Sequence, residues 1–297
     1  MQNVAYTISY IGGLDNRGSK GASVWTAATL FNTLADNNTY SIAHGIPGPA
    51  RDINIWLLPD FPPKSGPGAS PMLRKIATTA VVSQVVDFLL IASGAADIAL
   101  VKQILQRQLP DVCIRYSSDQ GARSSYQLCP LLYHELGHTK HYSQVGNGFW
   151  TSYIQDIVLH GGYGDKTDSD AGRIALSEGW GNYTERLFTV DRYQGTSKQF
   201  FADRATTELE YQVPTDNLDV YNQGWLVYGM YYDMTDGGVE PTTTNVIDNV
   251  TAFNTASIYH GLQPGVTTVR GYQSAINLQN GGLQAPQMEQ LVTSYLW

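Results

Sequence analysis

The stretch LLYHELGHTKH, residues 131–141, decides how the rest of this chain is interpreted. His134 and His138 are four residues apart, so on an α-helix their side chains lie on one face, with Cβ atoms about 6 Å apart. Two imidazoles at that spacing can bind one tetrahedral Zn²⁺ ion. Glu135 lies beside them, where it can take a proton from a metal-bound water. The stretch therefore predicts a helix that carries a catalytic zinc site.

An ordinary surface helix with two histidines and a glutamate is the alternative interpretation of these residues. The flanking sequence favours a packed helix, because leucines recur at helical spacing and can face a core. Ser124 or Ser125 can cap the start of this helix, and Pro130 falls early enough to be tolerated.

Glu178, in the stretch ALSEGWGNY (residues 175–183), is the predicted third ligand of the zinc. It lies on a second expected helix, and two helices that cross about 8–10 Å apart can bring a carboxylate to the metal. Gly179 and Gly181 follow it and are poor helix formers. We therefore expect these glycines where another backbone approaches closely, at the contact with the zinc helix.

Two other residues compete with Glu178 for the third position. Glu185 lies two turns further along the same helix face, although a solvated carboxylate beside Arg186 is its simpler interpretation. His141 follows His134 by seven residues, which places it about 10.5 Å further along the helix axis. Three histidines spread over two turns do not easily converge on one ion, so we interpret His141 as a helix-face or substrate-side residue.

Further residues are expected to support the metal and the reaction. Asn182 lies four residues after Glu178 and could accept the free N–H of a metal-bound histidine. A donor for the developing oxyanion should come from the C-terminal third of the chain. No spacing rule selects among its candidates, which are Tyr228, Tyr231, Tyr232 and His260. The strand expected at 112–116 could pair with an extended substrate, as edge strands do, or be an ordinary strand.

The combination of His134-Glu135-x-x-His138 with Glu178 resembles the gluzincin clan of zinc metallopeptidases. More closely, residues 133–138 (YHELGH), 162–165 (GYGD) and 176–181 (LSEGWG) are similar to stretches in a family of little-characterised, zincin-like, cell-surface proteins of Bacteroidetes-type bacteria. In that family the second helix commonly reads E-S-W-A, which the present E-G-W-G matches with substitutions. The resemblance covers roughly residues 70–297 and implies a zincin fold, one Zn²⁺ per chain and peptidase chemistry.

Composition restricts the partners and the location of the protein. The 297 residues carry 18 Lys and Arg against 26 Asp and Glu, a formal net charge of -8. Polyanion binding needs clustered basic residues, and none are present, so the sequence favours a peptide or protein substrate and argues against nucleic acid.

Charged residues make up only 15% of the chain, which favours an extracellular or cell-surface location. The first residues lack a signal-peptide pattern, so either the protein is intracellular or the sequence is a mature or trimmed form, and the low charge content favours the second. Polar side chains interrupt the most apolar stretch, residues 76–100, so no transmembrane segment is expected.

The patterning predicts an α+β chain, with a zincin-like domain and a small β-rich N-terminal segment. Residues 1–58 contain runs that alternate with a period of two and are bounded by Gly, Asn and Asp, which is typical of strands. The run Asp36-Asn37-Asn38 is expected to form a turn between two of these strands. The Pro- and Gly-rich loop at 59–71 marks the expected boundary between a β-rich segment, 1–68, and a catalytic domain, 69–297. Helices are expected at 72–92, at 98–109, within 125–188, near 266–278 and near 285–295, with one short strand at 112–116.

Two smaller features remain open at the level of sequence. Asp165, Asp168 and Asp170 could bind Ca²⁺ together with loop carbonyls, but they lack EF-hand spacing, and a solvated turn-forming loop is the alternative. Cys113 and Cys129 are the two cysteines. Either a disulfide or two free buried thiols fits their positions.

These observations predict a zinc-dependent metallopeptidase in which Glu135 is the general base. The alternative is a non-catalytic cell-surface binding protein with a zincin-like domain. The intact Glu135 argues against that alternative, because a binding module does not need a general base.

Overall fold

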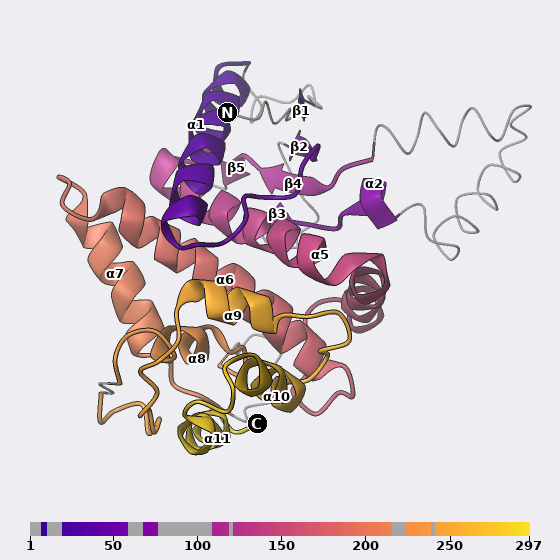
Figure 1. The fold of residues 1–297 in the computed structure, drawn as a ribbon. Coiled ribbons are helices and arrows are strands. Elements are labelled where there is room, and N and C mark those ends of the chain that lie inside the picture. Colours follow the sequence, from indigo (N-terminus) through magenta and orange to yellow (C-terminus); the bar gives the residue numbers. More distant parts are fainter. Residues whose placement is uncertain are drawn as a thin grey trace, which may run out of the picture.

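Two long helices form the centre of the molecule in the computed structural model, which describes residues 7–10, 20–58, 68–76, 109–118, 121–215, 224–238 and 241–297. They are α5 (Ser125–His160) and α6 (Ala171–Tyr193), which pack against each other. Figure 1 shows the sheet on one side of this pair and the C-terminal helices on the other. The C-terminal half adds the helices α7 (Gln199–Glu210), α8 (Tyr228–Asp233), α9 (Thr255–Gly261), α10 (Val269–Gln279) and α11 (Ala285–Ser294).

The main sheet has four short strands in the order β1-β2-β4-β3. They are β1 (Thr7–Tyr10), β2 (Asn54–Leu58), β4 (Val112–Arg115) and β3 (Gly68–Ala69). β1, β2 and β4 run parallel, and β3 pairs antiparallel with β4. β4 therefore has a neighbour on each side, so of the two interpretations left open for the strand at 112–116, an ordinary strand is confirmed and a substrate-pairing edge is not. A separate hairpin joins β5 (Ser117–Ser118) to β6 (Gly121–Ala122).

Helix α1 (Lys20–Ala43) replaces much of the β-structure expected in residues 1–58. The polar run Asp36-Asn37-Asn38, expected to form a turn, lies inside this helix. Polar residues favour turns when their side chains bond to the local backbone, but here the protein interior supplies other partners. The buried Asn37 accepts a hydrogen bond from Lys140 Nζ at 2.7 Å, which ties α1 to α5. In the parts of 1–58 that the structure describes, strands are confirmed only as β1 and β2.

The sheet also crosses the boundary expected at residue 68. β2 comes from the N-terminal segment and β4 from the rest of the chain, and Ile55 pairs with Val112. Apolar residues of both strands, such as Leu57 and Ile114, are fully buried in one common core. The N-terminal segment is thus part of the same sheet as the chain that follows it.

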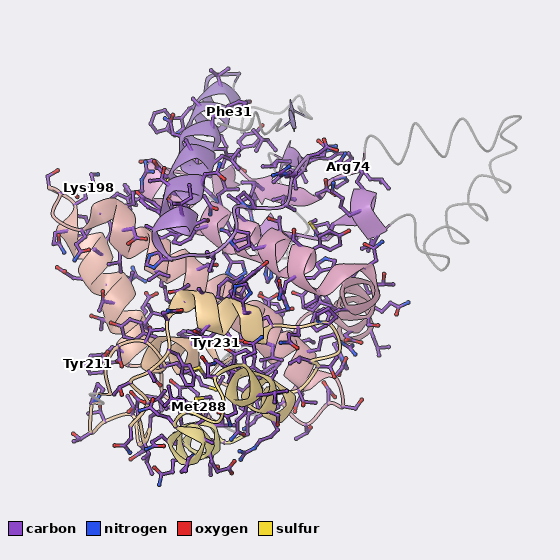
Figure 2. All side chains as sticks on the ribbon, viewed as in Figure 1. Phe31, Arg74, Lys198, Tyr211, Tyr231 and Met288 are labelled. Carbon is purple, nitrogen blue, oxygen red and sulfur yellow. The ribbon has the colours of Figure 1, made fainter. Side chains whose placement is uncertain are left out.

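The helices predicted in the C-terminal half are confirmed as α10 and α11. Those predicted at 72–92 and 98–109 lie outside the described residues, except for α2 (Leu73–Ile76). Figure 2 shows Tyr231 and Met288 inside the layer of C-terminal helices, while Phe31 and Lys198 lie at the periphery. Among the described helices, none is long and apolar enough to cross a membrane. The molecule is mostly helical with one small sheet, which agrees with α+β at a coarse level.

Candidate metal centre

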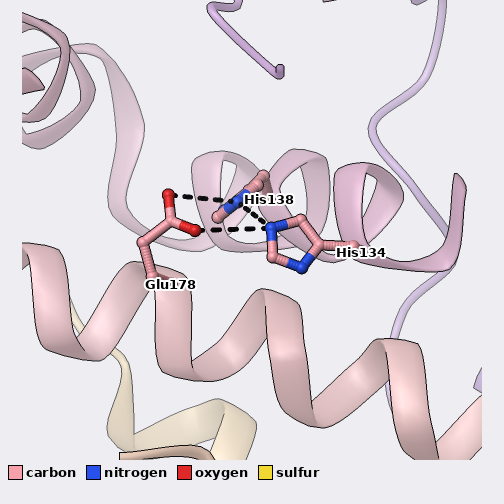
Figure 3. Close-up of side chains that lie close together, drawn as sticks. All are labelled: His134, His138 and Glu178. Atoms are coloured by element: carbon pink, nitrogen blue, oxygen red, sulfur yellow. Dashed lines mark hydrogen bonds and ion pairs between the residues drawn. The ribbon is translucent and has the colours of Figure 1, made fainter. Parts of the chain in front are cut away.

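His134 and His138 of α5 and Glu178 of α6 converge on one point, as Figure 3 shows. The Nε2 atoms of the two histidines are 3.0 Å apart. Glu178 Oε2 lies 3.4 Å from His134 Nε2, and Glu178 Oε1 lies 3.5 Å from His138 Nε2. His138 and Glu178 are buried, whereas the His134 side chain is 12% exposed, so the cluster has one more open side.

The spacing of these donor atoms fits a tetrahedral metal ion. With metal–ligand distances of about 2.0–2.1 Å, the edges of a tetrahedron are about 3.3 Å long, and the three distances here are 3.0, 3.4 and 3.5 Å. Glu178 Oε2 is also buried without a hydrogen-bond partner, a costly state that a cation would relieve. Two imidazoles and one carboxylate are the ligands of catalytic zinc sites that keep a fourth position open.

Electrostatics favours an ionised carboxylate at the centre of the cluster. Burial alone would raise the pKa of Glu178, but the nearby His138 and His134 outweigh it and hold this pKa well below its usual range. Burial opposes the charged form of His134 in the same way, yet Glu178 and Glu185 raise its pKa well above the usual range. The site therefore attracts positive charge to the point that the three side chains share.

Glycines allow the two helices to approach this closely. A Cβ atom on Gly181 would lie 2.9 Å from the imidazole of His134 and 3.1 Å from that of His138. The close approach predicted for Gly181 is thus present at α5, the helix that carries His134 and His138. Another backbone also approaches Gly179 closely, but it is that of Val227, at the start of α8, so the expected contact with the zinc helix is wrong for this glycine. The two glycines face opposite neighbours because they lie two residues apart on the helix.

Glu135 points from α5 toward the sheet. It is buried, and its Oε2 accepts a hydrogen bond from Ser70 Oγ at 2.8 Å. Burial raises the pKa of Glu135, although His134, His138 and Ser70 oppose the shift. A carboxylate whose proton affinity has been raised in this way suits a general base.

Glu185, and not Asn182, lies at the second ring nitrogen of His134. Glu185 Oε2 lies 3.2 Å from His134 Nδ1, so Glu185 accepts from the nitrogen that faces away from the shared point. Asn182 instead donates to the carbonyl oxygen of Glu178 at 2.9 Å and accepts from Arg186 at 3.0 Å. Glu185 is thus neither the third ligand nor a merely solvated carboxylate, and it takes the histidine-orienting position that was assigned to Asn182.

His141 lies outside the cluster. It shares a hydrogen bond with Ser177 Oγ at 3.0 Å and packs against Phe149 and Trp150. Burial lowers its pKa to about 3, so it is a neutral core histidine. The expectation that it is not the third ligand agrees with this position, whereas a substrate-side location does not.

Two tyrosines near the cluster were missed by the sequence analysis. Tyr153 is buried on α5 and donates a hydrogen bond to Glu178 Oε1. Tyr163 also faces Glu178, whose negative charge adds to burial in raising the pKa of this phenol well above its usual range. Tyr163 lies within the GYGD stretch, which was noticed as a sequence similarity but given no role. Tyr153 carries no such signal in the sequence. It reaches Glu178 because α5 is kinked at Gly146 (φ 77°), between the two histidines and Tyr153.

The four oxyanion-donor candidates from the C-terminal third lie as follows. Tyr231 is fully buried, and its hydroxyl donates to the carbonyl of Leu176 at 3.2 Å, so it is engaged elsewhere. The Tyr228 ring packs against the Arg186 guanidinium, 4.6 Å from its centroid. Tyr232 is partly buried against the core, and His260 is exposed in the last turn of α9. Tyr153 and Tyr163 are the phenols that the structure places at Glu178.

The aspartate loop and the cysteines favour the simpler of the two interpretations. Asp165 Oδ1 accepts from Thr167 N, and Asp168 Oδ2 accepts from Asp165 N, each at 2.8 Å, so these carboxylates stabilise a turn. Asp170 forms an ion pair with His160. Cys113 and Cys129 are both free and buried, which excludes the disulfide between them in this structure.

Comparison of the chain with protein-family models, curated proteins and solved structures gives no match. The functional interpretation therefore depends on the residues and geometry described above.

Proposed function

We propose that this protein is a zinc-dependent metallopeptidase, in which His134, His138 and Glu178 hold one Zn²⁺ and Glu135 is the general base. The observation that carries the proposal is the triangle of three donor atoms, 3.0–3.5 Å apart, on two helices in a largely buried site. A resident ion at this point would have three protein ligands and an open position, which is the arrangement of catalytic rather than structural zinc.

A bound zinc would polarise the scissile carbonyl and lower the pKa of a bound water toward about 7. Glu135 would accept the proton of that water and later deliver it to the leaving amine. Its raised pKa helps it to hold the proton between these two steps. Glu185 would fix the orientation of His134, and Tyr153 that of Glu178.

Peptides and proteins are the proposed substrates, acted on outside the cytoplasm. The low charge content supports that location, and the net charge of -8 disfavours nucleic acid. Within the described residues, β3 is one of the two outer strands of the sheet and lies beside Glu135. Such an edge can add an extended peptide as a further strand, which would place its carbonyls near the general base.

Hydrolysis of a peptide library by purified wild-type protein and by Glu135→Gln tests the proposal, with the zinc content of both measured by elemental analysis. We expect about one zinc per chain in both proteins, and a loss of hydrolysis of at least about a hundredfold in the variant. Glu289→Gln, on the exposed face of α11, is the matched control and should behave as wild type. Zinc binding without hydrolysis by the wild type would favour a non-catalytic binding protein.

A further inference from the structure

The end of strand β3 lies directly against the proposed general base. A Cβ atom on Gly68 would lie 2.5 Å from Glu135 Oε1, 3.1 Å from Glu135 Cδ and 2.9 Å from a methyl group of Leu131. A side chain at position 68 would therefore clash with the Glu135 carboxylate and with Leu131. The absence of a side chain on Gly68 provides the space that the carboxylate occupies.

Ser70, two residues later, holds the other oxygen of the same carboxylate. Its hydroxyl lies 2.8 Å from Glu135 Oε2 and 2.9 Å from the Glu135 carbonyl oxygen. Ser70 is 6% exposed, so water competes little for this hydrogen bond. A hydrogen bond to a buried carboxylate is stronger than one between neutral groups.

The backbone that carries these two residues is fixed on both sides. Gly68 and Ala69 pair with Ile114 and Cys113 of β4, which anchors them to the sheet. On the other side, the carbonyl of Ser70 accepts a hydrogen bond from Trp150 Nε1 at 3.3 Å. Trp150 is fully buried and its ring lies 5.8 Å from that of His138, so one side chain contacts both this backbone and a metal ligand.

We propose that Gly68 and Ser70 form a seat that positions the Glu135 carboxylate, with Ser70 as a positioning residue for the general base. The inference rests on the function proposed above. Its physical reason is that a general base displaced by about 1 Å loses much of its effect. The hydroxyl fixes Oε2 and the glycine leaves room for Oε1, so both oxygens have a defined place.

Ser70 Oγ lies within hydrogen-bond distance of the carbonyl oxygen of Glu135 as well as its carboxylate, and this arrangement suits a base that gains and loses a proton. When Glu135 is ionised, the single hydroxyl proton of Ser70 can point to Oε2. After Glu135 takes a proton, its O–H can donate to Ser70 Oγ while the Ser70 proton turns to the carbonyl oxygen of residue 135. Ser70 Oγ therefore has hydrogen-bond partners in both states, and alanine would provide none.

The first test compares wild type with Ser70→Ala in steady-state peptide hydrolysis. We expect kcat to fall about tenfold, a part of the 10²–10⁴-fold effect of a general base, with KM within about twofold and zinc content unchanged. Ser41→Ala is the matched control, because Ser41 is also buried and its hydroxyl donates to the carbonyl of Asn37, away from this site. An unchanged kcat in Ser70→Ala would overturn the inference while leaving the proposed peptidase intact.

A double-mutant cycle tests the contact without using activity. The thermal unfolding midpoints of wild type, Ser70→Ala, Glu135→Ala and the double variant give the coupling between the two side chains. We expect Ser70→Ala to lower the midpoint by about 2 °C in the wild-type background, and by clearly less once the Glu135 side chain is absent, because only the hydrogen bond to the carbonyl oxygen of residue 135 then remains. Equal effects in both backgrounds would overturn the seat. If the wild type hydrolyses no peptide, the proposed function fails, and the cycle still decides whether Ser70 holds Glu135.

Gly68→Ala is a second variant, which adds atoms beside the Glu135 carboxylate where Ser70→Ala removes a hydroxyl. It leaves the hydroxyl of Ser70 in place and adds one methyl group where the carboxylate lies. We expect kcat to fall at least as much as in Ser70→Ala while zinc stays bound. Full activity in Gly68→Ala would show that the carboxylate does not depend on this space.

Discussion

Among the described residues, two clusters combine histidine with carboxylates closely enough to hold a metal ion, and they differ in geometry and burial. His134, His138 and Glu178 direct their donor atoms at a common point in a largely buried site. His160, Asp168 and Asp170 also bring potential ligand atoms close together, but all three are partly exposed.

The two clusters differ in how the histidine nitrogens are used. His160 turns Nε2 to Asp170 at 3.0 Å and Nδ1 to Asp168 at 3.5 Å, so its two nitrogens serve two different carboxylates. His134 turns Nε2 to the shared point and Nδ1 to Glu185. In the first case the charges satisfy one another as ion pairs, and in the second a buried carboxylate oxygen stays without a hydrogen bond. Residue type alone therefore does not define a metal centre, whereas the direction of the free electron pairs does.

The largest expected effect comes from removing one carboxylate from each cluster. Glu178→Ala should reduce bound zinc from about one per chain to a small fraction, because two histidines alone do not complete a zinc site. Asp170→Ala should keep full zinc content, because Asp170 pairs with His160 and lies outside the cluster of His134, His138 and Glu178. Elemental analysis of both variants after dialysis against a weak chelator measures the difference. Loss of zinc only in Asp170→Ala would reverse the assignment of the two clusters. Equal loss in both variants would show that the clusters do not differ in zinc binding.

The next effect concerns the carboxylate behind His134. Glu185→Ala should weaken zinc affinity about ten- to a hundredfold, the usual cost of losing the partner that orients a metal-bound histidine. Glu208→Ala is the matched control, because Glu208 pairs with Arg186 without contacting His134. Competition with a fluorescent zinc chelator gives both affinities. If the control loses as much affinity as Glu185→Ala, the effect belongs to the Arg186 network and not to His134.

Local sequence rules were sufficient to predict that His134, His138 and Glu178 lie close together. The spacing of His134 and His138 fixes their common helix face, and Glu178 lies on a second helix with Gly181 three residues later. These features depend on helix geometry, which a short stretch of sequence determines.

Contacts between distant parts of the chain explain what could not be predicted. Asn37 was expected in a turn, but its buried partner Lys140 is more than a hundred residues away in sequence, and nothing local indicates it. Asn182 and Glu185 lie on similar sides of α6, so only the rotation of α6 against α5 decides which of them meets His134. Tyr153 reaches Glu178 only because the backbone bends at Gly146.

A smaller effect is expected from the glycine that lets α6 meet the two histidines. Gly181→Ala places a methyl group 2.9 Å from His134, so overpacking should cost about 1–3 kcal/mol of unfolding free energy and also reduce zinc affinity. Gly148→Ala is the control, because a Cβ atom there meets nothing within 4 Å. That variant should gain about 0.5–1 kcal/mol, the usual advantage of alanine over glycine in a helix. Urea denaturation measures both, and a stabilised Gly181→Ala would show that the helices are not in tight contact here.

The smallest effect is the pH dependence of the exposed cluster. Burial opposes the charged form of His160, but Asp170, Asp168 and Asp156 outweigh it and raise the His160 pKa. A raised folded-state pKa means that the ion pairs stabilise the protein fully below pH ~6.5 and lose this contribution as the pH rises through the folded value. His160→Gln should therefore destabilise by at most about 1 kcal/mol at pH 5, and by less at pH 9, because partly exposed pairs are screened by solvent. Urea denaturation of both proteins at the two pH values measures this difference. An equal cost at pH 5 and pH 9 would show that packing against Gly164, rather than charge, is what His160 contributes.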